Sequence, residues 1–155
     1  MTENTTIVAG GHVFQVLADL TTAPRSMTVT VRAEGGRDWT FQEPAWRLLG
    51  YGLGDHGFYL WSARRLISFG DAGLREPELT PLDEDIIAVF YLDPTWLAVC
   101  ETSVRLLGQA GELSRVELSE VATSVRLEGR VLVLDGPSGV QIKLEVGAKQ
   151  LRVLD

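Results

Sequence analysis

Residues 96–118 read WLAVCETSVRLLGQAGELSRVEL, and they contain three short apolar runs separated by turns. The runs are Trp96 to Glu101, Ser103 to Leu107 and Leu113 to Leu118. In each run apolar residues recur with a period close to two, which is typical of a β-strand with one buried face. The stretch therefore predicts three consecutive strands joined by tight connections.

The same pattern continues on both sides of this stretch. Turn formers such as Asp93-Pro94-Thr95 and Asp135-Gly136-Pro137-Ser138-Gly139 bound most of the runs. Further strands are predicted at Val13–Leu17, Met27–Arg32, Ile86–Leu92, Val121–Leu127, Val131–Asp135 and Val140–Val146. We expect an all-β fold, an antiparallel β-sandwich or a partly open barrel, because either buries one face of each strand.

Two segments leave the choice between helix and strand open. Glu43–Leu49 and Phe58–Ile67 could each form one or two helical turns. The second segment reads equally well as a strand with a bulge at Ala63-Arg64, and the Gly-rich run before it favours a hairpin. We therefore expect strands there.

A weak internal repeat links the predicted strands. Leu97 and Val99 align with Leu132 and Leu134 at an offset of 35 residues. Val104 and Leu106 align with Val140 and Ile142 at 36, and Tyr59, Trp61 and Leu66 align with Leu97, Val99 and Val104 at 38.

In this pattern the chain from Tyr59 onward resembles β-propeller blades, above all Trp96–Gly129 followed by Arg130–Val146. The resemblance implies an alternative fold, a propeller-like arc of about three four-stranded units near 57–95, 96–129 and 130–155. Because propellers typically have four to eight blades, such an arc would stay open or be completed by a second chain. We treat residues 1–155 as a single all-β domain, whose oligomeric state the sequence leaves open.

Composition restricts the class of function. The chain has 155 residues, 45% hydrophobic and 23% charged, with a net charge of −7. Because its basic residues are scattered, nucleic-acid binding is not expected. We expect neither a membrane span nor a secretory signal, and the single cysteine agrees with a reducing compartment, so the cytoplasm is the expected location. Arginine far outnumbers lysine, which hints at a GC-rich bacterial genome.

No motif predicts catalysis or a cofactor. Gly52-Leu53-Gly54-Asp55-His56-Gly57 matches the spacing of a dinucleotide-binding loop, but that loop needs a helix after it and a strand is predicted instead. We interpret the glycines as a turn. The two histidines are far apart, and Cys100 has no second cysteine, so neither a metal site nor a bound cofactor is expected.

We therefore expect a non-enzymatic binding or assembly module that acts through a protein partner. Because this chain is acidic, a basic partner would complement its charge. Aromatic residues beside a Gly-rich loop and an Arg pair have the composition of an interaction hot spot, and an acidic run adds a docking patch. The predicted interaction residues are Trp46, Tyr51, Asp55, His56, Tyr59, Arg64, Arg65, Asp83 and Glu84. The alternative is a small enzyme or ligand-binding β-barrel with a site near Asp55 and His56.

Overall fold

The computed structural model describes residues 2–9, 12–23, 26–33, 38–44, 49–53, 58–62, 64–69 and 77–155. Within these ranges the chain is all-β and contains no helix. The strands form four antiparallel sheets of four strands each, and none of these sheets is closed. The all-β prediction is confirmed. The arrangement fits the propeller-like alternative, with four sheets where the sequence suggests about three.

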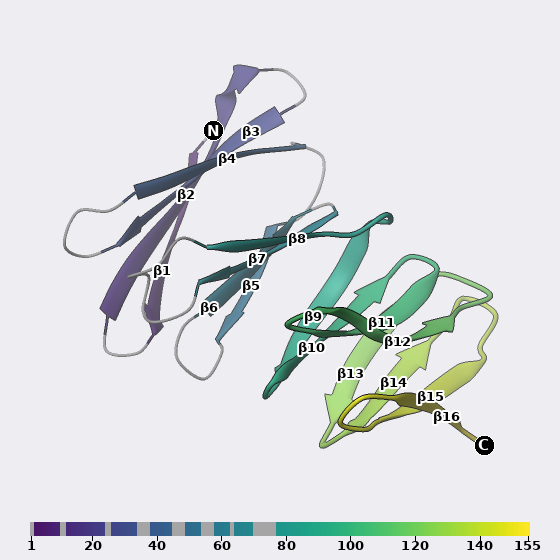
Figure 1. Ribbon diagram of the computed structural model, residues 1–155. Coiled ribbons are helices and arrows are strands. Elements are labelled where there is room, and N and C mark those ends of the chain that lie inside the picture. The colour runs from purple at the N-terminus through teal and green to yellow at the C-terminus, as the bar shows by residue number, and fades with distance from the viewer. Residues whose placement is uncertain are drawn as a thin grey trace. The chain divides into compact units, whose positions relative to one another are not determined.

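Contacts between residues divide the chain into two compact units, Met1–Leu82 and Asp83–Asp155. Each unit contains two sheets whose strands follow one another in sequence order, as the colours of Figure 1 show. The first unit has β1 (Thr2–Ala9), β2 (His12–Ala23), β3 (Ser26–Ala33) and β4 (Asp38–Pro44), followed by β5 (Leu49–Leu53), β6 (Phe58–Ser62), β7 (Arg65–Phe69) and β8 (Glu78–Pro81). The second has β9 (Ile86–Leu92), β10 (Thr95–Cys100), β11 (Ser103–Gly108) and β12 (Gly111–Glu117), followed by β13 (Ser124–Glu128), β14 (Val131–Asp135), β15 (Gln141–Val146) and β16 (Leu151–Leu154).

Each unit has its own hydrophobic core, formed by alternate residues of its two sheets. In the first unit, Phe14 and Phe58 lie 4.6 Å apart between ring centroids, and Phe58 stacks on Phe69 at the same distance. In the second, Leu97 and Val99 of β10 pack with Leu132 and other residues of β14–β16. Burial of these apolar faces is the main favourable contribution to folding in both units.

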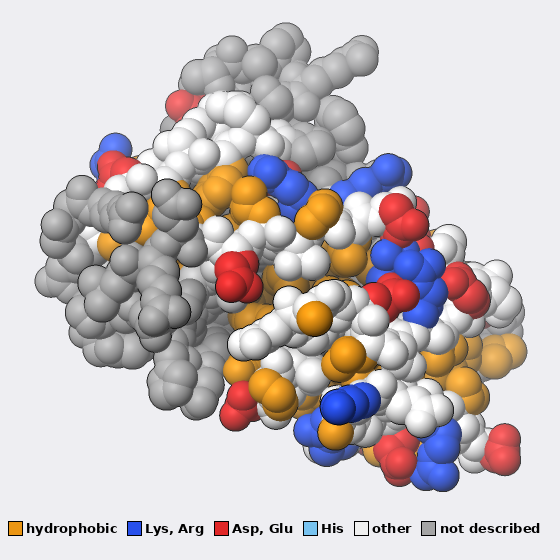
Figure 2. Space-filling model, in the orientation of Figure 1, with side chains coloured by type: hydrophobic (Ala, Val, Ile, Leu, Met, Phe, Trp, Pro, Cys, Tyr) orange, Lys and Arg blue, Asp and Glu red, His pale blue; other side chains and the backbone are white. Residues whose placement is uncertain are grey.

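The opposite faces of the sheets differ in character. In the β9–β12 sheet, Ala98 and Cys100 point away from the core and are also fully buried. In the β13–β16 sheet the corresponding face is charged, with ion pairs Arg126–Glu128 at 2.8 Å and Arg152–Glu145 at 2.9 Å. Figure 2 shows charges of both signs interspersed on the visible face of the second unit. The last sheet thus has one apolar face and one face that carries ion pairs, where Val133 between Arg126 and Lys143 is nevertheless fully buried.

The segment Phe58–Ile67 forms two strands, β6 and most of β7, as expected. Arg64 lies in a turn between them, so the predicted bulge is a hairpin turn. Gly52 lies in β5, and the strand that follows the Gly-rich run confirms that a helix does not begin there. Residues 45–48, which belong to the other ambiguous segment, lie outside the described residues.

Candidate functional site

Strand β5 contains Tyr51, one of the predicted interaction residues. Tyr51 and Leu53 are 51% and 59% exposed. They lie opposite Leu60 and Phe58 of β6, so both project on the core side of the sheet but at its edge. Two largely apolar side chains, two residues apart in the strand, therefore remain in contact with water.

The other face of β5 is made by glycine. Gly50 and Gly52 lie opposite Trp61 and Tyr59 of β6. A Cβ on Gly50 would lie 2.0 Å from Trp61 Cζ2, and one on Gly52 would lie 2.2 Å from the Tyr59 hydroxyl. The two rings, whose centroids are 6.1 Å apart, thus extend over the backbone of β5. Glycine is required here because any side chain would occupy the place of a ring.

The remaining predicted residues of this segment differ in surroundings. Tyr59 is buried at 5% exposure. Arg64 is exposed, and its carbonyl oxygen accepts a hydrogen bond from the Leu82 amide at 2.6 Å. Trp46, Asp55 and His56 lie outside the described residues, so the predicted enzyme or ligand site near Asp55 and His56 stays a prediction.

Arg65 contributes to a structural ion pair. Its Nε donates to Glu43 Oε1 at 2.8 Å, and its Nη2 donates to the same carboxylate and to the Gln42 carbonyl oxygen. Glu43 is only 3% exposed. Because a buried carboxylate needs a compensating charge, this pair connects β4 to β7 inside the first unit. Sequence reasoning missed the burial of Glu43, because Glu43 begins a segment for which the sequence leaves helix and strand open.

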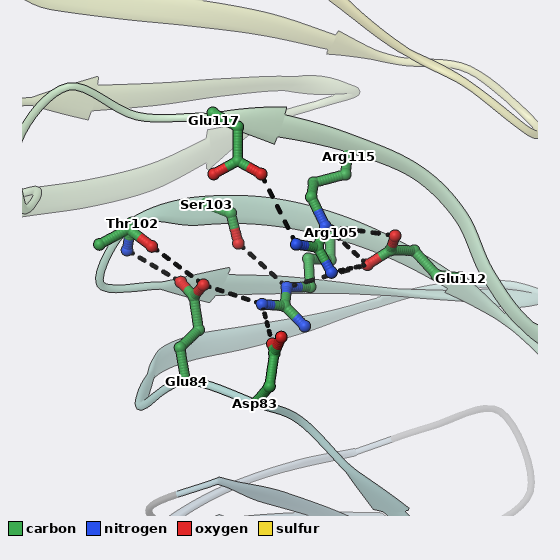
Figure 3. Close-up of polar contacts among 8 residues, drawn as sticks. All are labelled: Asp83, Glu84, Thr102, Ser103, Arg105, Glu112, Arg115 and Glu117. Atoms are coloured by element: carbon green, nitrogen blue, oxygen red, sulfur yellow. Dashed lines mark hydrogen bonds and ion pairs between the residues drawn. The ribbon is translucent and has the colours of Figure 1, made fainter.

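The predicted acidic patch is part of a larger set of charged and hydroxyl-bearing residues, which we call the Arg105 cluster (Figure 3). Arg105 of β11 is 3% exposed and lies at its centre. Its Nη2 donates to Asp83, and to Glu84 Oε2 at 2.8 Å, while its Nε donates to Ser103 Oγ at 3.0 Å. The full cluster consists of Asp83, Glu84, Thr102, Ser103, Arg105, Glu112, Arg115 and Glu117.

Glu84 is held from two sides. The Thr102 amide donates to its Oε1 at 2.8 Å, and the Thr102 hydroxyl donates to its Oε2 at 3.0 Å. Burial is the largest single influence and raises the pKa of Glu84, but the hydrogen bonds from Thr102 and Arg105 outweigh it and leave the pKa lowered. The Arg105 hydrogen bond likewise lowers the pKa of Asp83. Both carboxylates are thus held in the ionised form.

The two acids differ in exposure. The Asp83 side chain is 74% exposed, whereas that of Glu84 is 17% exposed. Glu84 therefore attaches the segment that precedes β9 to strand β11. Of the two acids, Asp83 is the one exposed to solvent. Sequence reasoning missed Arg105. An arginine inside an otherwise apolar strand is rarely buried without an acidic partner, and the acidic run some twenty positions earlier was the signal of this ion pair.

Comparisons with known proteins give a likeness of fold. No protein family matches this sequence, and no curated protein does. Among solved structures, the chain is similar to the crystal structure of HIRA(644-1017), with a TM-score of 0.52 and 11% sequence identity, over 98% of this chain and 52% of that chain. The chain thus spans about half the length of that structure. This neighbour and the four four-stranded sheets fit blade-like repeats.

Two further observations concern the described residues. They contain no group of three or more His, Cys, Asp or Glu side chains placed to hold a metal ion. Nor does any helix in them have the length and apolar character needed to cross a membrane.

Proposed function

We propose that this chain is a non-enzymatic module that binds a protein partner, with strand β5 at the centre of the contact. The observation that carries the proposal is the exposure of Tyr51 and Leu53 on a strand of a well-packed sheet. Exposed aromatic and aliphatic side chains beside polar neighbours are characteristic of binding surfaces. The fold supports this proposal, since each of the four described sheets has two edge strands that a partner can contact.

We further propose that the partner carries a basic surface and that the two meet in the cytoplasm. The chain has 21 acidic and 14 basic residues. Complementary charge accelerates association, and salt screens it over about 8 Å at physiological ionic strength. Asp83 is a described acid that solvent reaches, although its carboxylate also accepts from Arg105. Association should slow as salt concentration rises, and a rate independent of salt would remove this part of the proposal.

Site-specific photo-crosslinking tests the partner and the contact together. A photoreactive phenylalanine analogue replaces Tyr51 in the cell, and the same analogue at Leu79 serves as the control. Leu79 is 49% exposed and lies on β8, at the other edge of the same sheet. We expect one protein to be captured from position 51 and not from position 79.

The captured protein is then purified and titrated by calorimetry. Tyr51→Ala should weaken its binding about tenfold, corresponding to about 1.4 kcal/mol, whereas Leu79→Ala should leave binding unchanged. Equal affinities of the wild type and Tyr51→Ala for every captured protein would show that the contact does not involve β5.

A further inference from the structure

Strand β5 lies at an edge of its sheet. In the described part of the chain its one strand neighbour is β6, with pairs from Leu49↔Ser62 to Leu53↔Phe58. In an antiparallel pair, alternate residues turn their N–H and C=O groups toward the partner strand and the others turn theirs away. An edge strand therefore offers a row of donors and acceptors at the spacing of another extended chain.

The other edge strands carry features that discourage such pairing. Charged side chains and proline on an edge strand are the usual protection against an added strand. By sequence, six of the eight edge strands in the described sheets contain at least one such residue. These are Glu3 in β1, Asp38 in β4, Glu78 and Pro81 in β8, Glu112 in β12, Arg126 in β13 and Arg152 in β16. Strand β9 has none, but each of its residues is buried or half-buried.

Strand β5 combines an uncharged edge with exposed apolar side chains. Its sequence, Leu-Gly-Tyr-Gly-Leu, contains neither a charge nor proline. Beside it, an added strand would place one set of alternate side chains against Tyr51 and Leu53. The other set would meet the glycine face, where the rings of Trp61 and Tyr59 extend over Gly50 and Gly52. Both faces favour uncharged, apolar side chains.

From this combination we infer that β5 is a site of β-strand addition, at which an extended, uncharged segment of a partner protein pairs with the edge. Main-chain hydrogen bonds would supply affinity, and apolar side chains at alternate positions of the segment would supply specificity. A charged side chain packed against Leu53 would lose water to a side chain that offers no hydrogen bond, so this position selects against charge. This inference rests on the proposed function and specifies how the partner is recognised.

The probe is a phage-displayed library of random peptides of about nine residues, the length of a long strand. The library is selected on the full chain and counter-selected on the Leu53→Lys variant. This substitution places a charge on the edge strand at a position whose side chain is already exposed. We expect enriched peptides with apolar residues at alternate positions and no charge between them. Circular dichroism and thermal unfolding confirm that each variant is folded, and Tyr51→Lys is a second variant should Leu53→Lys not fold.

The decisive measurement separates main-chain from side-chain recognition. An enriched peptide is synthesised with and without N-methyl groups on alternate amides, in both registers, and titrated by fluorescence polarisation. Methylation in one register should weaken binding about tenfold or more, and Leu53→Lys should do the same. Leu79→Lys, at the opposite edge of the sheet, should leave binding unchanged.

Three results would overturn the inference. The first is the absence of any enriched peptide, and the second is binding that survives methylation in both registers. The third is a concentration-dependent doubling of solution mass that Leu53→Lys abolishes, because this result would assign the edge to a second copy of this chain. The proposed function is judged separately by crosslinking. A partner that needs Tyr51 while no peptide pairs through its backbone would leave the function standing and remove strand addition.

Discussion

Cys100 is the only thiol of the chain and lies fully buried in β10. Burial, and next the negative charge of Glu84, raise the pKa of the thiol to about 12. Because the thiolate is the reactive form, a native thiol with this pKa is almost unreactive near neutral pH.

We predict that Cys100 reacts with Ellman's reagent at least about 100-fold more slowly in the native protein than in denaturant, since both exposure and ionisation oppose the reaction. Absorbance of the released thiolate measures both rates. Equal rates would mean that β10 opens rapidly or that the thiol is accessible.

Gly50 shows the requirement for glycine at a single position. In Gly50→Ala the new Cβ would meet the indole of Trp61 at 2.0 Å, and the ring must move. Overpacking of this kind costs about 1–3 kcal/mol, which urea unfolding would measure.

Gly108→Ala is the matched control for Gly50→Ala. Its Cβ would lie 3.1 Å from the end of the Leu113 side chain, which can rotate away. We expect a change in unfolding free energy below about 1 kcal/mol for this control. Equal effects of the two substitutions would show that the Trp61 ring is not held over β5.

At the scale of elements, the Arg105 cluster attaches the acidic segment that precedes β9 to strand β11. We predict that Arg105→Met lowers the free energy of unfolding by about 3 kcal/mol, because it leaves the half-buried Glu84 carboxylate without its cation. Adding Glu84→Gln should recover part of this loss, since the amide carries no charge.

Denaturant unfolding of the four members of this cycle measures the coupling between the two residues. Strict additivity of Arg105→Met and Glu84→Gln would mean that the Arg105–Glu84 contact contributes nothing to stability.

The same cluster determines a dependence of stability on acid. The pKa values of Asp83 and Glu84 are lowered from 3.8 and 4.5 in the folded chain. Groups with a depressed folded pKa stabilise the protein above their unfolded pKa, and this contribution is lost as pH falls through the folded value. We predict that the free energy of unfolding declines below pH 4.5, partly because these two groups become protonated.

Urea titrations at a series of pH values would show this decline. Arg105→Met should reduce its slope, because the substitution removes the cation shared by both carboxylates. An unchanged slope in this variant would assign the acid sensitivity to other groups.

At the scale of the molecule, the two units have separate cores, so we expect local openings to be confined to one unit. Leu144→Ala removes a fully buried side chain of the second core, which typically costs about 2–5 kcal/mol. We predict that amide exchange measured by mass spectrometry accelerates within Asp83–Asp155 and much less within Met1–Leu82.

Phe69→Ala, in the first core, should give the reverse pattern. Uniform acceleration along the whole chain in either variant would show that the two units unfold as one.

The repeat visible in the sequence corresponds to equivalent strands of successive sheets. Leu97 lies in β10 and Leu132 in β14, each the second strand of its sheet, and both face the second core. The earliest repeat is displaced by one residue, because Phe58 and Leu60 rather than Tyr59 and Trp61 face the first core. Since strand side chains alternate between faces, a shift of one residue in the alignment exchanges the inner and outer faces. The shift was not visible in the sequence, because Tyr59 and Trp61 on the outer face are as hydrophobic as core residues.

The sequence by itself determined the all-β class, most strands and the blade-like repeat, because alternation and turn residues are local properties of the chain. From composition alone it also predicted an interaction segment around Tyr51, which stays a prediction. The tertiary structure decided the rest: four sheets in two units, the pairing of Arg105 with Asp83 and Glu84 and of Arg65 with Glu43, and the exposure of β5. These depend on which strands become neighbours and which edges remain unpaired, and residues some twenty positions apart meet only when the sheets form.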